Sequence, residues 1–116
     1  MLLSGLIPIK DVNEYDVEGA GRFAVLENNK NGGHRFVYKR VVNGLSGLIN
    51  EGRNKLFILV IEAINDDGIS WSYIAKVKSF VGIFFLPILI SFDDVLKGFQ
   101  PALDSSLSVH GSFIVS

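Results

Sequence analysis

The chain has 116 residues, no cysteine, and a formal net charge of −1 from 11 basic and 12 acidic residues. This length fits one domain, residues 1–116, with a core of its own. The lack of cysteine excludes disulfides, thiolate catalysis and Cys-based zinc or iron–sulfur sites. The charge lacks the basic excess of nucleic-acid-binding proteins. We therefore expect a single domain with no cofactor, no metal site and no nucleic-acid partner.

The first third of the chain predicts three strands, of which the last two form a hairpin. Ile7–Ile9 contains a proline and fits a short edge strand. Asp11–Gly21 is polar and acidic, so we expect a loop there. Arg22–Glu27 is a strand candidate, and Asn28–Gly33 is rich in residues that tolerate positive φ, which is typical of a loop tip. His34–Val42 is the next strand, and it forms a hairpin with Arg22–Glu27.

The segment Lys55–Val77 predicts the clearest element, a hairpin around Asp67-Gly68. The glycine-rich segment Asn43–Asn54 that precedes it is predicted to be a loop. An Asp-Gly pair between two apolar runs favours a type I′ turn, which needs positive φ at both residues. After the turn, apolar residues alternate with polar ones, which predicts a strand with one buried face. The residues expected on that buried face are Ile69, Trp71, Tyr73, Ala75 and Val77.

A two-residue turn at this position fixes the pairing of the two strands. Glu62 would lie opposite Tyr73, and Leu59 would lie opposite Lys76. The second face of the hairpin would then be apolar on one strand and lysine-lined on the other. Either the apolar run Phe80–Phe92 covers that face, or the face is an apolar patch with a charged rim, as in protein–protein sites.

The last third of the chain begins with an apolar run and ends with alternating apolar and polar residues. Phe80–Phe92 is too short to cross a bilayer as a helix, which needs about 20 residues, so we expect two buried strands that meet near Pro87. Ser91–Phe99 is the best helix candidate, because Ser91 is followed three residues later by an acid. Alternation over Leu107–Val115 predicts a final strand.

These elements predict a mainly β fold, a small single-domain sandwich or open barrel of six or seven strands with one short helix. An α+β domain is the alternative if Asp11–Gly21 or Ser46–Asn54 is helical. The first residues, Met1–Ile7, lack the basic region and long apolar core of a signal peptide. We therefore expect a soluble, cytoplasmic protein with no membrane partner; the sequence indicates no oligomeric state.

An enzymatic interpretation depends on two histidines. His34 and His110, with Lys39 or Arg40, could cleave RNA without a metal: one histidine would remove the 2′-hydroxyl proton and the other would protonate the leaving oxygen. Ser108–His110 resembles the last strand of pancreatic-type ribonucleases, although that family's cysteines and helical first histidine are absent. Gly32–Lys39 is similar to a strand of RelE-like ribosome-dependent nucleases, in which helices precede the strand.

The leading hypothesis is a small binding protein that acts by contact with another protein, such as an inhibitor or an immunity-type partner of a toxin or enzyme. A phage or other structural subunit is a further alternative. Neither face of the strand His34–Val42 is cleanly apolar, and Arg and Tyr are enriched at interface hot spots. We favour a binding protein over an enzyme and assign no catalytic residues; if the chain is an enzyme, the candidates are His34, His110, Lys39 and Arg40. The residues predicted to contact the partner are Arg35, Phe36, Tyr38, Lys39 and Arg40.

Overall fold

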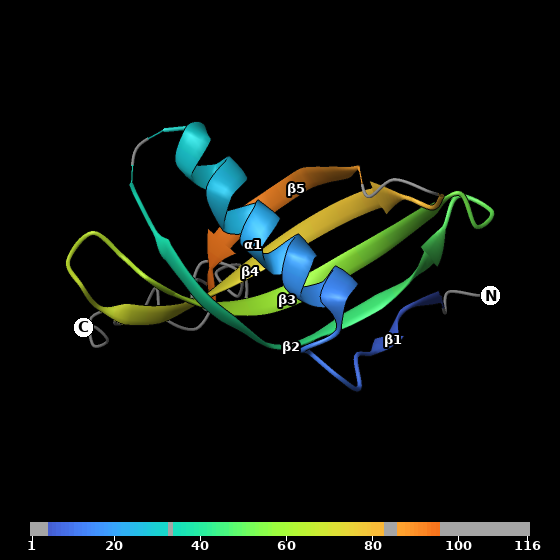
Figure 1. Ribbon diagram of the computed structural model, residues 1–116, viewed down its shortest axis with the longest axis horizontal. Helices are drawn as coiled ribbons and strands as arrows, with labels where there is room; N and C mark the ends of the chain where they lie inside the picture. The colour runs from blue at the N-terminus through green and yellow to red at the C-terminus, as the bar shows by residue number, and fades with distance from the viewer. Residues whose placement is uncertain (1–4, 33, 83–85, 96–116) are drawn as a thin grey trace, which may run out of the picture.

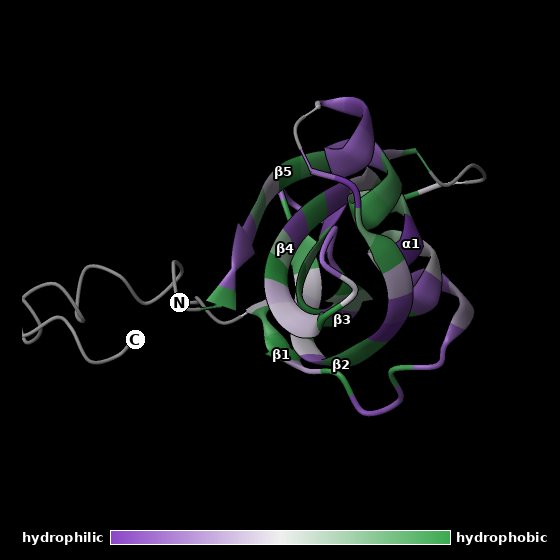
Figure 2. Cartoon of the chain, turned by 90° about the vertical axis from the view of Figure 1, so that its left-hand side faces the viewer, coloured by the Kyte–Doolittle hydropathy of each residue, from purple (hydrophilic) through white to green (hydrophobic). Residues whose placement is uncertain are grey.

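A computed structural model describes residues 5–32, 34–82 and 86–95, which form one curled antiparallel sheet and one helix that the sheet wraps around (Figures 1 and 2). The sheet has five strands in the order β1-β2-β3-β4-β5. In chain order the elements are β1 (Ile7–Pro8), α1 (Tyr15–Lys30), β2 (Val37–Ile49), β3 (Asn54–Ile64), β4 (Ser70–Phe80) and β5 (Pro87–Asp94).

The mainly β class with one helix is confirmed, but the arrangement differs from two packed sheets. The described residues form a single curled sheet, and α1 fills its concave side. The predicted strand Leu107–Val115 lies outside the described residues. Among the described residues, no helix is long and apolar enough to span a membrane.

The position of the helix corrects two predictions. Asp11–Gly21 was predicted to be a loop and Arg22–Glu27 a strand, but α1 takes up most of both. Its buried residues recur at a helical spacing of three and four, and most are small enough for the helix to lie close to the sheet. Acids occupy its first turn and a lysine its last, in accord with the helix dipole. The buried residues are Val17, Ala20, Gly21, Ala24 and Val25.

The glycines of β2 explain a third correction. The segment Asn43–Asn54 was predicted to be a loop, but β2 runs to Ile49. A Cβ at Gly44 would lie 2.5 Å from the backbone oxygen of Ile58, so the glycine permits a close approach of strands. Two shifts of register interrupt the first half of β2, which accounts for its poor alternation of apolar and polar residues.

The central hairpin turns at the predicted residues, but with a different geometry. The Gly68 N–H donates to the Asn65 carbonyl and the Asn65 N–H donates to the Ile69 carbonyl. Gly68 has φ 79°, whereas Asp67 is not among the residues with positive φ, so the turn is not type I′. The pairing therefore differs from the prediction by one residue: Glu62 lies opposite Ser72.

This one-residue difference moves every side chain of β3 to the other face. Leu59 lies opposite Ala75 rather than Lys76, and it is fully buried against α1. The predicted inward face of β4 is confirmed for Tyr73, Ala75 and Val77. Trp71 lies on the same face, opposite Ala63, but it is 43% exposed, and Ile69 is 52% exposed, where the hairpin projects beyond the rest of the sheet (Figure 1).

The apolar run Phe80–Phe92 is also less buried than predicted. Phe80 ends β4 and Pro87 begins β5, so the proline starts a strand and does not interrupt one. Leu89 and Phe92 pack against the core, but other apolar residues of the run are exposed. The helix predicted over Ser91–Phe99 is wrong at its start, because Ser91–Asp94 belongs to β5. Beyond Asp94, only Val95 of this segment is among the described residues.

A side chain of α1 fixes the start of β2, and this leads to a prediction. Asn29 accepts a hydrogen bond from the Phe36 N–H (2.9 Å) and donates one to the Phe36 carbonyl (2.8 Å). Asn29→Ala should lower the free energy of unfolding by about 1–3 kcal/mol, because both partly buried backbone groups lose their partner. Urea denaturation measures this. The exposed Asn13→Ala is the control, and equal effects of the two variants would contradict the prediction.

Candidate functional site

The residues predicted to contact a partner divide into two groups. Phe36 and Tyr38 point inward. The Phe36 ring lies 4.8 Å from that of Tyr73, and the Tyr38 ring lies under the Arg22 guanidinium at 4.7 Å. Burial is the main cause that raises the pKa of Tyr38 above its ordinary value. These two aromatic residues therefore help to join β2 to the rest of the fold.

The three cationic residues of the prediction are exposed. Arg40 Nε lies 2.7 Å from Glu62 Oε1, and Lys39 Nζ lies 3.7 Å from Glu62 Oε2. The Ser70 hydroxyl donates to the same carboxylate at 2.6 Å. Hydrogen bonds from Ser70 and then Arg40 lower the pKa of Glu62 to about 2. Arg35 lies at an exposed position before β2 begins.

This arrangement predicts a pH dependence. A lowered pKa means that the Glu62 contacts stabilise the fold above the ordinary value of 4.5 and are lost as the pH falls toward 2. We expect NMR to show the Glu62 carboxyl titrating near pH 2, and Ser70→Ala to move the midpoint upward, since its hydrogen bond is the largest cause. Ser72 lies opposite Glu62 in the sheet, so the Ser72→Ala variant is the control, and it should leave the midpoint unchanged. An unchanged midpoint in the Ser70 variant would contradict the assignment.

The enzymatic candidates are only partly placed. His34 Nδ1 lies 3.1 Å from Asp66 Oδ2, and Asp66 Oδ1 accepts a hydrogen bond from the Arg35 N–H at 3.0 Å. Lys39 and Arg40 contact Glu62 and do not line the cavity beside His34. His110 lies outside the described residues. The structure therefore does not bring the four proposed groups together within the part of the chain that it describes.

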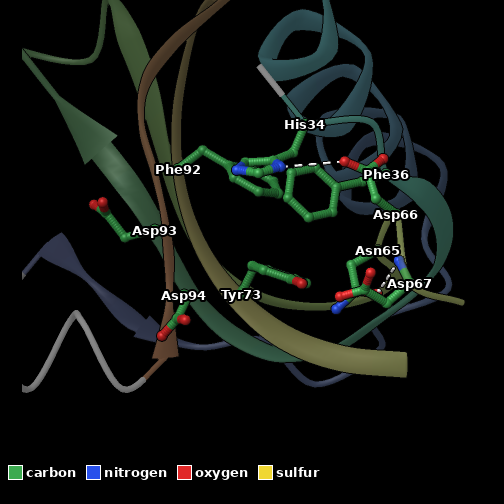
Figure 3. Close-up of a pocket in the computed structure, with 9 residues that line it drawn as sticks. All are labelled: His34, Phe36, Asn65, Asp66, Asp67, Tyr73, Phe92, Asp93 and Asp94. Atoms are coloured by element: carbon green, nitrogen blue, oxygen red, sulfur yellow. Dashed lines mark hydrogen bonds and ion pairs between the residues drawn. The ribbon is translucent and has the colours of Figure 1, made fainter. Parts of the chain in front are cut away.

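His34 borders a cavity of about 420 Å³ at the end of the sheet where β3 turns into β4 and β5 ends (Figure 3). We call it the acidic cavity. Three aromatic rings line it, from Phe36, Tyr73 and Phe92. Asn65 and four aspartates complete the lining: Asp66, Asp67, Asp93 and Asp94. The sequence shows the two Asp-Asp pairs, but nothing in it indicates that a turn and a strand end would bring them together.

The opposite end of the sheet exposes apolar side chains. Here the segment that begins at Gly5, the β2–β3 turn, the end of β4 and the start of β5 converge (Figure 1, right-hand end). We call this the turn end, comprising residues 5–7, 48–53, 80–82 and 86–88. Six of its large apolar residues are 43–62% exposed: Ile7, Leu48, Phe80, Val81, Leu86 and Ile88.

The β2–β3 turn within this end has an unusual backbone. Asn50, Glu51 and Gly52 have consecutive positive φ values of 53°, 59° and 84°. Such a conformation is unfavourable for Glu and uncommon for Asn, and it persists only where the surrounding structure holds it. Strained residues of this kind concentrate at sites of recognition and catalysis. The turn end therefore combines exposed apolar area with a strained turn.

Sequence analysis missed the turn end for physical reasons. Phe80 and Leu86 belong to a run that its composition assigns to the core, and Leu48 belongs to a segment assigned to a loop. A signal was present in the pair Asn50 and Gly52, which favour left-handed backbone. It could not be used without knowing that two strands meet there.

The described residues hold no group of three His, Asp or Glu side chains arranged to bind a metal ion. No protein-family model matches the chain, and no curated protein is significantly similar to it. The function is therefore inferred from the two ends of the sheet.

Proposed function

We propose that the protein is a protein-binding module that docks through the turn end, and that it acts as an inhibitor of an enzyme. The observation that carries this proposal is that neighbouring segments at one end of the sheet expose large apolar side chains beside a strained turn, with Leu48 and Phe80 on opposite faces of the sheet. Isolated exposed apolar residues are ordinary, but a contiguous group is typical of interaction surfaces. Phe80, Leu48 and Leu86 are each about half exposed or more and come from three adjacent segments.

The turn end is held in place before any partner binds. The Val81 N–H donates to the Arg53 carbonyl at 3.0 Å, which joins the β4–β5 connection to the β2–β3 turn. Buried Asn54 accepts a hydrogen bond from the Asn50 side chain and donates one to the Ser79 carbonyl. A surface that is already ordered loses less conformational entropy on binding, which favours affinity.

The shape of the turn end favours a concave partner. Turns and a chain segment at the end of one elongated sheet form a projecting edge (Figure 1), and the molecule measures 48 × 35 × 25 Å along its principal axes. Clefts are the usual binding sites of enzymes. We infer that the partner cleft is that of an enzyme with polymeric substrates, because occupying such a cleft would block those substrates.

Two variants of the turn end test this proposal. We expect Leu48→Asp and Phe80→Asp to weaken partner binding by about 2 kcal/mol or more each, about thirtyfold, with little change in melting temperature. Leu26→Asp on the outer side of α1 is the matched control, because Leu26 is 62% exposed far from the turn end. Binding is measured by calorimetry with a partner captured from the source organism, and inhibition is measured against proteases and other polymer-cleaving hydrolases.

The outcomes separate the two candidate surfaces. Arg35→Ala and Arg40→Ala variants form a second arm of the same experiment. Loss of binding in this arm, with normal binding of Leu48→Asp and Phe80→Asp, would place the interface on the first half of β2 and refute the turn end. Binding without inhibition of any tested hydrolase would support a binding module and argue against an inhibitor of those enzymes.

A further inference from the structure

The acidic cavity combines two features that attract the same kind of ligand. The first is its aromatic lining. The rings of Phe36, Tyr73 and Phe92 lie within 4.8–5.5 Å of one another, and those of Tyr73 and Phe92 are stacked. The faces of aromatic rings carry partial negative charge and attract cations, most strongly organic cations that shed water easily. Burial raises the pKa of Tyr73, so its ring stays a neutral phenol at physiological pH.

The second feature is the charge around the rings. Carboxylates from the β3–β4 turn lie on one side of the aromatic rings, and Asp94 at the end of β5 lies on the other, whereas the side chain of Asp93 points away from the rings (Figure 3). The Arg35 N–H and then His34 lower the pKa of Asp66, which keeps that carboxylate ionised. Of the lining residues, His34 is the only one that can carry a positive charge. The side chains around the cavity therefore carry a net negative charge.

We propose that the acidic cavity binds an alkylammonium group, carried either by a free polyamine or by a lysine side chain. The apolar stem of such a group would contact the aromatic rings, and its charged nitrogen would contact the carboxylates. The volume of about 420 Å³ lies within the ordinary range for small-ligand sites, about 300–1,000 Å³. A hard metal ion fits less well, because the described residues lack a coordinating set of three such groups. This site is at the opposite end of the sheet from the turn end.

The test measures binding by NMR chemical-shift titration of the full chain. The probes are spermidine, a short lysine-containing peptide with blocked ends, and 1,4-diaminobutane with butane-1,4-diol as its uncharged counterpart. We expect the amines to shift the signals of Phe36, Tyr73 and Asp67, and the diol to have no effect. Asp67→Asn should weaken amine binding roughly fivefold, and Phe36→Leu should weaken it roughly threefold. Glu14→Gln, an equal change of charge outside the cavity, is the control.

Each outcome bears on the proposal. Binding of spermidine but not of the peptide indicates a small-molecule site, and the reverse indicates a partner's lysine; both support an alkylammonium site. The proposal would be overturned if Mg²⁺ displaced the amines as well as they displace one another and if the Phe36→Leu variant bound the amines with unchanged affinity. Both results together would show only an acidic surface. No shift at millimolar amine would also overturn it. Asp67 is exposed at a turn, so its variant keeps the test decisive if Phe36→Leu fails to fold.

Discussion

Leu59→Ala should lower the free energy of unfolding by about 2–5 kcal/mol, the range found when a large side chain is removed from a core. Leu59 is fully buried in the central part of β3, between the sheet and α1. Its neighbour Ile58 points to the opposite face, across from Lys76, and is only partly buried. Ile58→Ala should therefore have a clearly smaller effect, about 1 kcal/mol. Urea denaturation of the two variants provides a matched comparison.

The comparison also distinguishes two registers of the central hairpin. A two-residue turn would place Leu59 opposite Lys76 and would bury Ile58. The observed turn places Leu59 opposite Ala75 and buries it, and it places Ile58 opposite Lys76. A larger effect for Ile58→Ala than for Leu59→Ala would contradict the observed pairing. Equal effects would show that both faces of β3 are covered.

The hairpin shows how far local sequence could predict this fold. Alternation after Gly68 correctly identified a strand and the buried Tyr73, Ala75 and Val77. It could not determine how many residues form the turn, because Asp-Gly is compatible both with a two-residue turn and with a longer one that ends in a left-handed glycine. Since β3 is apolar on both faces, its own pattern gave no second indication of the register.

The helix was missed for a different reason. The segment Tyr15–Lys30 has two glycines, several polar residues and only small or β-branched residues on much of its buried side. Glycine and β-branched valine have low helix propensity, and packing against the sheet overrides it. The candidate site was less predictable still, because the turn end and the acidic cavity each combine segments that are far apart in the sequence. Only the pairing of strands brings them together.

Gly44→Ala should destabilise the protein by about 1–3 kcal/mol, the usual cost of forcing extra atoms into a packed region. The new Cβ would lie 2.5 Å from the backbone oxygen of Ile58 and 3.2 Å from the Leu59 Cα. Both atoms belong to the backbone of the central strand, which is paired on both sides and cannot move alone. The change is measured as a lower urea midpoint with an unchanged m-value.

Gly47→Ala is the informative counterpart, because the same substitution meets a movable neighbour. Its Cβ would overlap the carbonyl oxygen of Gly5, in a segment joined to the sheet by the short pairing of β1 with β2. That segment can shift away, so we expect a smaller loss of stability than at Gly44. The shift displaces residues 5–7 from the turn end, and partner binding should therefore weaken while the core stays folded.

If Gly47→Ala instead unfolds the protein as strongly as Gly44→Ala, the segment before α1 is an integral part of the fold. If stability falls only slightly and partner binding is unchanged, residues 5–7 do not belong to the docking surface.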